Sequence, residues 1–136
     1  MLICGVKAKD LAALRLDPEE DLLLALRQYV ALKNIKNAVI VSGVGSLRSY
    51  HYHLVDDNRI PPREIFIKDD RPCDIMNVTG MIIDGKVHAH ISLGDGDKMF
   101  GGHLEEGSLV LTFASIFIME VTNEFAPGWD VPGKLP

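Results

Sequence analysis

The chain has 136 residues, the size of one ordinary domain, and its 47% hydrophobic and 24% charged residues are typical of a globular protein. Its formal net charge of -5 disfavours nonspecific binding of nucleic acid, because such binding requires a basic surface that displaces counterions. The two cysteines, Cys4 and Cys73, are too few for a disulfide framework, and no apolar run approaches the length of a membrane span, so we expect a cytoplasmic protein with reduced thiols and no membrane partner.

The first predicted elements are one strand and one amphipathic helix. The apolar segment Leu2 to Lys7 is predicted to be a strand. Asp17 followed by Pro18, with Glu20 at the capping-box position, predicts a helix N-terminus capped by Asp17. From Leu22 to Lys33 the apolar residues recur at helical spacing, which predicts one helix with a single buried face.

Most of the remaining chain has the composition of strands separated by short turns. Asp84-Gly85 lies between two apolar runs and predicts a two-residue hairpin, because both central positions of that turn need positive φ. Gly94 to Asp97 is predicted to be a second turn. The predicted strands are Ala38 to Val41, Ser49 to Val55, Glu64 to Lys68, Cys73 to Ile83, Lys86 to Leu93, a strand that starts near Met99, and Ser108 to Val121.

One helix among many strands predicts the α+β class: a mixed, largely antiparallel sheet with the helix packed on it, and with barrel-like closure as one possibility. Residues 1–124 are predicted to form the body of a single domain. Residues 125–136 are predicted to be a C-terminal tail of that same domain, which wraps around its surface or around a neighbouring subunit.

The segment Ser42 to Arg48 is rich in glycine and follows a predicted strand. It lacks the lysine of a phosphate-binding P-loop, and no helix follows it as a dinucleotide-binding fingerprint would require. A tight turn is therefore the favoured interpretation. Arg48 is a candidate for binding a small anionic ligand, because a guanidinium group suits a carboxylate or phosphate.

Three histidines form the candidate metal site. His88 and His90 are two residues apart on a predicted strand, so both side chains point to the same face. The strand that starts near Met99 is predicted to return alongside and bring His103 next to them. Three neutral imidazoles with an open fourth position suit a divalent metal, above all zinc. An exposed polar strand face is the alternative interpretation of the same pattern.

A metal site of this kind also needs carboxylates that orient the imidazole rings. The nearby candidates in sequence are Asp95, Asp97, Glu105 and Glu106. A second pair with the same spacing, His51 and His53, has no evident third ligand and is interpreted as a solvated strand face. The sequence contains no recognisable nucleophile motif, so no catalytic residue is assigned.

Several motifs follow one another in a fixed order along the chain. They are the helix start Asp17 to Leu22, the segment Ser42 to Arg48, the strand Ile75 to Gly80, the HxHxxLG run His88 to Gly94, and the GGHL run Gly101 to Leu104. This order resembles the plants-and-prokaryotes conserved (PPC) domain family in its stand-alone prokaryotic form. The resemblance covers roughly residues 3–122.

The resemblance implies a sheet with a helix packed on it, assembly as a homotrimer, and in some prokaryotic members a metal on the histidines that match His88, His90 and His103. Prokaryotic members are often described as predicted DNA-binding proteins. This chain lacks the Arg-Gly-Arg-Pro hook with which the plant proteins grip DNA. The segment Arg71 to Met76 also lacks the glycine and phenylalanine that usually introduce that strand.

Three hypotheses follow. The first is a homotrimeric binding or assembly domain with a structural or regulatory divalent metal on the three histidines. The second is a zinc-dependent hydrolase of a small anionic substrate, with Glu105, Glu106 or Asp97 as general base and Arg48 binding the anion. The third is a DNA-binding protein, which the acidic composition and the absent hook disfavour.

Overall fold

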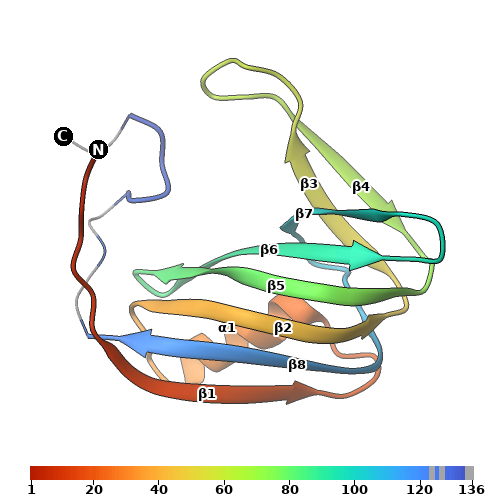
Figure 1. The fold of residues 1–136 in the computed structure, drawn as a ribbon, viewed down its shortest axis with the longest axis horizontal. Helices are drawn as coiled ribbons and strands as arrows, with labels where there is room; N and C mark the ends of the chain where they lie inside the picture. The colour runs from red at the N-terminus through yellow and green to blue at the C-terminus, as the bar shows by residue number, and fades with distance from the viewer. Residues whose placement is uncertain (123–124, 126–127, 134–136) are drawn as a thin grey trace.

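The computed structural model describes residues 1–122, 125 and 128–133 of the chain. These residues form one α-helix and one eight-stranded sheet (Figure 1). No helix among them is long and apolar enough to cross a membrane. The elements, in chain order, are β1 (Ala8–Leu16), α1 (Leu22–Leu32), β2 (Ala38–Leu47), β3 (Tyr50–Val55), β4 (Glu64–Asp69), β5 (Cys73–Ile83), β6 (Lys86–Gly94), β7 (Met99–Leu104) and β8 (Val110–Val121).

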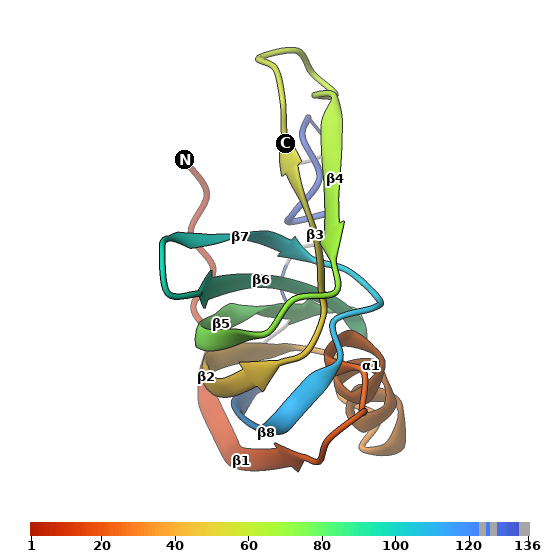
Figure 2. The ribbon, with the colours of Figure 1, turned by 90° about the vertical axis from the view of Figure 1, so that its right-hand side faces the viewer.

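The sheet is open and antiparallel, with the strand order β1-β8-β2-β5-β6-β7-β3-β4. Every neighbouring pair of strands in that order is antiparallel. The α+β class is therefore confirmed, whereas the mixed sheet and the barrel-like closure are wrong. β1 and β4 are the two edges, and the hairpin of β3 and β4 stands away from the other strands instead of turning back to β1 (Figure 2).

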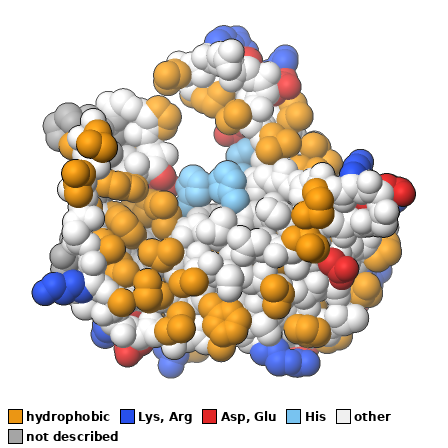
Figure 3. Space-filling view, in the orientation of Figure 1, with side chains coloured by type: hydrophobic (Ala, Val, Ile, Leu, Met, Phe, Trp, Pro, Cys, Tyr) orange, Lys and Arg blue, Asp and Glu red, His pale blue; other side chains and the backbone are white. Residues whose placement is uncertain are grey.

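The hydrophobic core lies between one face of the sheet and helix α1, which crosses behind the strands in Figure 1. Leu22, Leu26 and Val30 of the helix are buried, as the helical spacing predicts. They belong to the same core cluster as Ile116 and Ile118 of β8. The helix therefore covers one face of the sheet, and the opposite face, which we call the open face, is the one that carries the histidines (Figure 3).

The helix begins later than the sequence pattern indicates. Asp21 is the N-cap, and its carboxylate accepts a hydrogen bond from the backbone N–H of Leu24 at 3.1 Å. Asp17 is therefore wrong as the cap. The reason is tertiary: the N–H of Glu19 donates to the carbonyl of Val110, and the N–H of Leu22 donates to that of Ser108, both at 3.0 Å. These bonds hold the chain, with a turn at Pro18 and Glu19, against the start of β8 until Asp21.

Two segments differ from the predicted strands and turns. The first strand is Ala8–Leu16 and not Leu2 to Lys7; it pairs with β8 and turns Leu14 and Leu16 inward. The predicted turn Ser42 to Arg48 lies almost entirely within β2. Its glycines make room for neighbours, since a Cβ at Gly43 would lie 2.6 Å from Ile116 Cδ1 and 2.8 Å from Val78 Cβ.

The other predicted strands and both turns are confirmed, except that β2 continues six residues beyond the predicted end at Val41. The remaining strand ends differ from the prediction by two residues at most. Asp84 and Gly85 have φ of 48° and 76°, the positive values that a two-residue hairpin requires. The division into a body, residues 1–124, and a tail, residues 125–136, stays a prediction. Residues 123–124, 126–127 and 134–136 lie outside the described part of the chain.

Candidate metal centre

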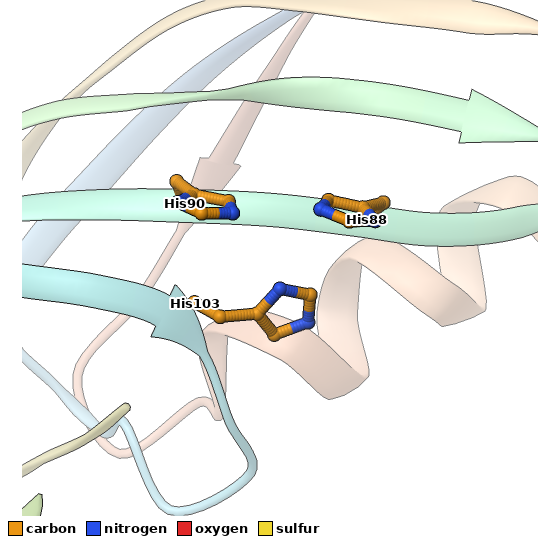
Figure 4. A group of neighbouring side chains, drawn as sticks. All are labelled: His88, His90 and His103. Atoms are coloured by element: carbon orange, nitrogen blue, oxygen red, sulfur yellow. The ribbon is translucent and has the colours of Figure 1, made fainter. Parts of the chain in front are cut away.

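Two neighbouring strands bring the three predicted histidines together. His88 and His90 project from the open face of β6 because they are two residues apart. His103 of β7 lies directly opposite His90 in the antiparallel pairing. The three rings therefore face one another across β6 and β7, with ring nitrogens directed into the space between them (Figure 4).

The spacing of the ligand atoms fits a divalent metal. One nitrogen from each of His88, His90 and His103 lies within 4.8 Å of the other two. The ring centroids are 5.4 Å apart for His88 and His90, 4.7 Å for His88 and His103, and 5.3 Å for His90 and His103. Zinc holds imidazole nitrogens at about 2.0–2.1 Å, so two ligated nitrogens lie roughly 3–4 Å apart, a separation that small side-chain rotations reach.

Two of the rings are held in the neutral form that a metal requires. Burial, followed by the neighbouring rings of His53 and His88, lowers the pKa of His103 to about 4. Burial and the ring of His88 also lower the pKa of His90 below its usual value. At neutral pH the lone pairs of both rings are therefore available to a cation.

Glycines in β7 allow the strands of the site to approach closely. Gly101 has a φ of 148°, and a Cβ there would lie against the carbonyl of Ile91 in β6. A Cβ at Gly102 would lie 2.9 Å from both Leu54 Cδ2 and Tyr52 Cδ2 of β3, and closer still to the carbonyl oxygen of His53. These contacts explain why glycine stands at both positions, on the strand that carries His103.

A carboxylate that the sequence analysis missed orients His88. The Nδ1–H of His88 donates to Oδ2 of Asp130 at 3.0 Å, which leaves Nε2 as the nitrogen with a lone pair. Asp130 lies in the C-terminal tail, 42 residues beyond His88, and no motif or spacing in the sequence connects the two.

Three of the four predicted carboxylates have other partners. Asp95 accepts hydrogen bonds from the backbone of Asp97 and Lys98 within the turn after β6. Glu106 pairs with Arg27 of the helix. Glu105 contacts a histidine, but that histidine is His53 of the second pair, whose Nδ1 lies 2.7 Å from Glu105 Oε1.

The two histidines of the second pair, His51 and His53, have different surroundings. His51 donates from Nδ1 to the backbone carbonyl of Glu106 at 2.7 Å. His53 lies opposite His103, and their rings stack with centroids 4.4 Å apart. His53, His103 and Glu105 form a second group whose ligand atoms all lie within 4.8 Å of one another, so the structure supplies the third ligand that sequence spacing does not show.

Arg48 lies outside both groups. Its Nη1 donates to the carboxylate oxygens of Glu19 at 2.8 and 3.1 Å, and this pairing raises the pKa of the guanidinium above its usual value. Arg48 and Lys68 line an open hollow of about 620 Å³, together with the acidic residues Asp69 and Asp70. Anion binding by Arg48 stays a prediction, and such an anion would have to compete with Glu19.

Comparisons with known proteins agree with this fold. The family model of the Plants and Prokaryotes Conserved (PCC) domain, the family called PPC above, matches residues 5–122. A metal-containing protein from Archaeoglobus fulgidus superposes with a TM-score of 0.79 at 23% identity, over 91% of this chain and 88% of that one. A plant- and prokaryote-conserved protein from Pyrococcus horikoshii superposes with a TM-score of 0.78 at 25% identity, over 91% and 87% of the two chains.

Other relatives carry different names. A bifunctional protein GlmU from Synechococcus is 29% identical over 108 residues, which are 79% of this chain and 16% of that protein, so the chain spans about a sixth of the curated relative it matches. A Bacteroides thetaiotaomicron protein whose name proposes DNA binding has a TM-score of 0.70 at 20% identity, over 88% and 85% of the chains. An α-acetolactate decarboxylase from Bacillus subtilis has a TM-score of 0.56 at 12% identity, over 84% and 53%.

Proposed function

This chain belongs to the Plants and Prokaryotes Conserved domain family, and on that premise we propose that it is a homotrimeric binding or assembly domain that holds a divalent metal, most simply zinc, on His88, His90 and His103. The observation that carries the proposal is the convergence of three imidazole nitrogens within 4.8 Å on the open face of the sheet. The neutral state of His90 and His103 and the carboxylate of Asp130 on His88 support it.

The donor set favours zinc over harder cations. Three imidazoles suit Zn²⁺, Cu²⁺, Fe²⁺ and Ni²⁺, whereas Mg²⁺ and Ca²⁺ prefer oxygen ligands. A metal-containing protein among the fold relatives supports a metal as such, without identifying it. A bound zinc would supply a fixed positive charge that ties β6 to β7, and at an open coordination position it would also polarise a ligand.

The metal test uses the full chain. Purified protein is loaded with Zn²⁺, passed through a desalting column and measured for metal per chain by mass spectrometry. We expect at least one zinc per chain for the wild type and the loss of one zinc in His90→Gln. His51→Gln is the matched control, because His51 also lies on a strand but belongs to neither ligand group. Wild-type protein that retains only traces of zinc would overturn the proposal.

The open face of the sheet supports assembly. Large apolar side chains that share this face by register are exposed: Leu11 at 64%, Val44 at 49%, Phe113 at 41% and Phe117 at 37%. Figure 3 shows hydrophobic side chains gathered over β1, β8, β2 and β5 on this side of the molecule. An exposed apolar patch of this kind marks an interaction surface, and the proposed occupants are neighbouring copies of the same chain.

Light scattering on the full chain tests the trimer. The expected mass is three times the 15.0 kDa of one chain. A charged residue on the open face should weaken the interface, so Phe117→Lys is expected to lower the mass. Lys68→Ala, on the β4 edge hairpin, is the control and should leave it unchanged. A wild-type protein that runs as a monomer at all concentrations contradicts the proposal.

A second candidate function is a metal-dependent enzyme acting on a small anionic substrate, by hydrolysis or by decarboxylation. The observation that favours it is the fold shared with an α-acetolactate decarboxylase. When bound, zinc supplies Lewis-acid catalysis. Glu105, hydrogen-bonded to His53 beside the histidine cluster, is the carboxylate best placed to accept a proton there.

Zinc-loaded protein incubated with p-nitrophenyl phosphate tests hydrolysis, and incubation with acetolactate tests release of carbon dioxide. Turnover that disappears in both His90→Gln and Glu105→Gln would support the enzyme. No turnover of either probe above the rate of His90→Gln would count against it.

The DNA-binding hypothesis has a fold relative in its favour and the net charge of -5 against it. We expect no mobility shift with duplex DNA at low salt, where nonspecific binding is strongest.

A further inference from the structure

Three histidines form a continuous row across three neighbouring strands. His90 of β6 lies opposite His103 of β7, and His103 lies opposite His53 of β3. β7 is the middle strand of the three. His103 therefore has potential ligands on both sides: His88 and His90 towards β6, and His53 towards β3.

The β3 side of His103 has its own set of donors. One ligand atom from each of His53, His103 and Glu105 lies within 4.8 Å of the other two. Nδ1 of His53 is 2.7 Å from Glu105 Oε1, and the rings of His53 and His103 are stacked with centroids 4.4 Å apart. Two imidazoles and one carboxylate are a donor set that suits Zn²⁺ and Fe²⁺.

The charges around His53 also favour a cation. A second carboxylate, that of Glu64 on β4, lies 3.6 Å from the other ring nitrogen, Nε2. The side chain of His53 is only 16% exposed and that of Glu105 is 26% exposed. Within the described residues, neither carboxylate forms an ion pair with a lysine or arginine. Two carboxylates thus flank one imidazole without a neutralising cationic side chain.

We propose that His53, His103 and Glu105 form a second divalent-metal position beside the first, with His103 contributing one ring nitrogen to each metal. The inference rests on the proposed function in that His103 serves both positions. When the second metal binds, the proton of His53 moves from Nδ1 to Nε2, where Glu64 accepts a hydrogen bond from it. The second nitrogen of His103 gives up its proton to solvent, so both of its lone pairs become ligands.

This arrangement gives the two positions different chemistry. The first has three imidazoles, whereas the second has two imidazoles and a carboxylate, a harder donor set with a lower net charge once the metal is bound. Asp130 on His88 and Glu64 on His53 then play matching parts, because each carboxylate faces the ring nitrogen that does not bind metal. The outer carboxylates come from the C-terminal tail and from β4, so both ends of the site depend on segments outside β6 and β7.

Counting metals in variants of the full chain tests the proposal and separates the two positions. After zinc loading and desalting, we expect two zinc ions per chain in the wild type, one in the double variant His53→Gln, Glu105→Gln, one in His88→Gln, and none in His103→Gln. The control His51→Gln should keep two. One zinc in both the wild type and the double variant would overturn the second position and leave the first intact. If His88→Gln has no effect while the double variant loses all zinc, the triplet fails instead, and the single metal lies at the second position.

A cobalt titration counts the metal positions in proteins that are known to be folded, so that loss of metal through misfolding is not mistaken for loss of a ligand. Far-ultraviolet circular dichroism first establishes that each variant keeps the wild-type sheet. Added Co²⁺ should then produce absorbance in two steps in the wild type, with two equivalents at saturation, and in one step in the double variant. A single step at one equivalent in the wild type overturns the proposal regardless of how the variants behave.

Discussion

The neutral ring of His103 makes the stability of the metal-free protein depend on pH. Its pKa is about 4 in the folded chain, against the usual 6.5, chiefly because burial disfavours the charged imidazolium. In the unfolded chain the ring takes up its proton near pH 6.5. Between these two values the unfolded state binds more protons than the folded state, so acidification favours unfolding. The stability is complete above about pH 6.5 and is lost as the pH falls towards 4.

The magnitude follows from the difference between the two pKa values. Each pKa unit corresponds to 1.36 kcal/mol, so 6.5 minus about 4 gives roughly 3 kcal/mol for a fully protected ring. The ring of His103 is only half-buried, and solvent screening reduces this contribution. We therefore expect the free energy of unfolding to fall by about 1–2 kcal/mol, through this ring alone, between pH 7.5 and pH 4.5.

Urea denaturation of protein stripped of metal by dialysis measures the effect. Unfolding free energies at pH 7.5, 6.5, 5.5 and 4.5 are compared for the wild type and His103→Gln, whose amide does not titrate. The wild type should lose about 1–2 kcal/mol more than the variant over this range. His51→Gln, a control on strand β3, should follow the wild-type profile. Parallel pH profiles for the wild type and His103→Gln would refute the reasoning, because the ring would then titrate alike in both states.

Four further changes have defined outcomes. Leu26→Ala, which empties a fully buried core position, should lower the free energy of unfolding by about 2–5 kcal/mol in urea denaturation. Leu24→Ala, on the exposed side of the same helix, should change it by no more than about 0.5 kcal/mol. Equal losses would contradict the assigned buried face of the helix. Gly102→Ala should push β3 away from β7 and lower the free energy of unfolding by about 1–3 kcal/mol. Gly96→Ala should leave it unchanged, because an added Cβ there would meet no atom within 4 Å. An unchanged stability of Gly102→Ala would mean that the two strands are not in close contact. Asp130→Asn should weaken zinc binding about tenfold in a chelator competition, with Asp97→Asn unchanged; unaltered affinity would separate the tail from the site. Zinc at 100 times its dissociation constant should stabilise the wild type by about 2.7 kcal/mol for each occupied position in urea denaturation, and His90→Gln by less. Equal stabilisation of both proteins would place the zinc elsewhere.

Short-range sequence patterns were sufficient to predict that His88, His90 and His103 lie together. His88 and His90 share a face because strand residues alternate, and the short turn after β6 returns β7 antiparallel with His103 opposite His90. The same short-range rules place the hairpin at Asp84-Gly85 and the buried face of α1. In each case the residues that decide the geometry are close in sequence, so periodicity and turn chemistry carry the information.

The tertiary structure decided what depends on contacts between distant segments. Hydrogen bonds to the start of β8 delay the helix from Asp17 to Asp21, and close packing against β5 and β8 draws the glycines of Ser42 to Arg48 into a strand. Asp130 reaches His88 across 42 residues, and His53 reaches His103 only because β3 pairs with β7. The sequence by itself therefore determined the strand alternation and the three-histidine cluster. The open sheet, the carboxylates around the rings and the second group of donors depend on strand order, which residue spacing within one segment does not encode.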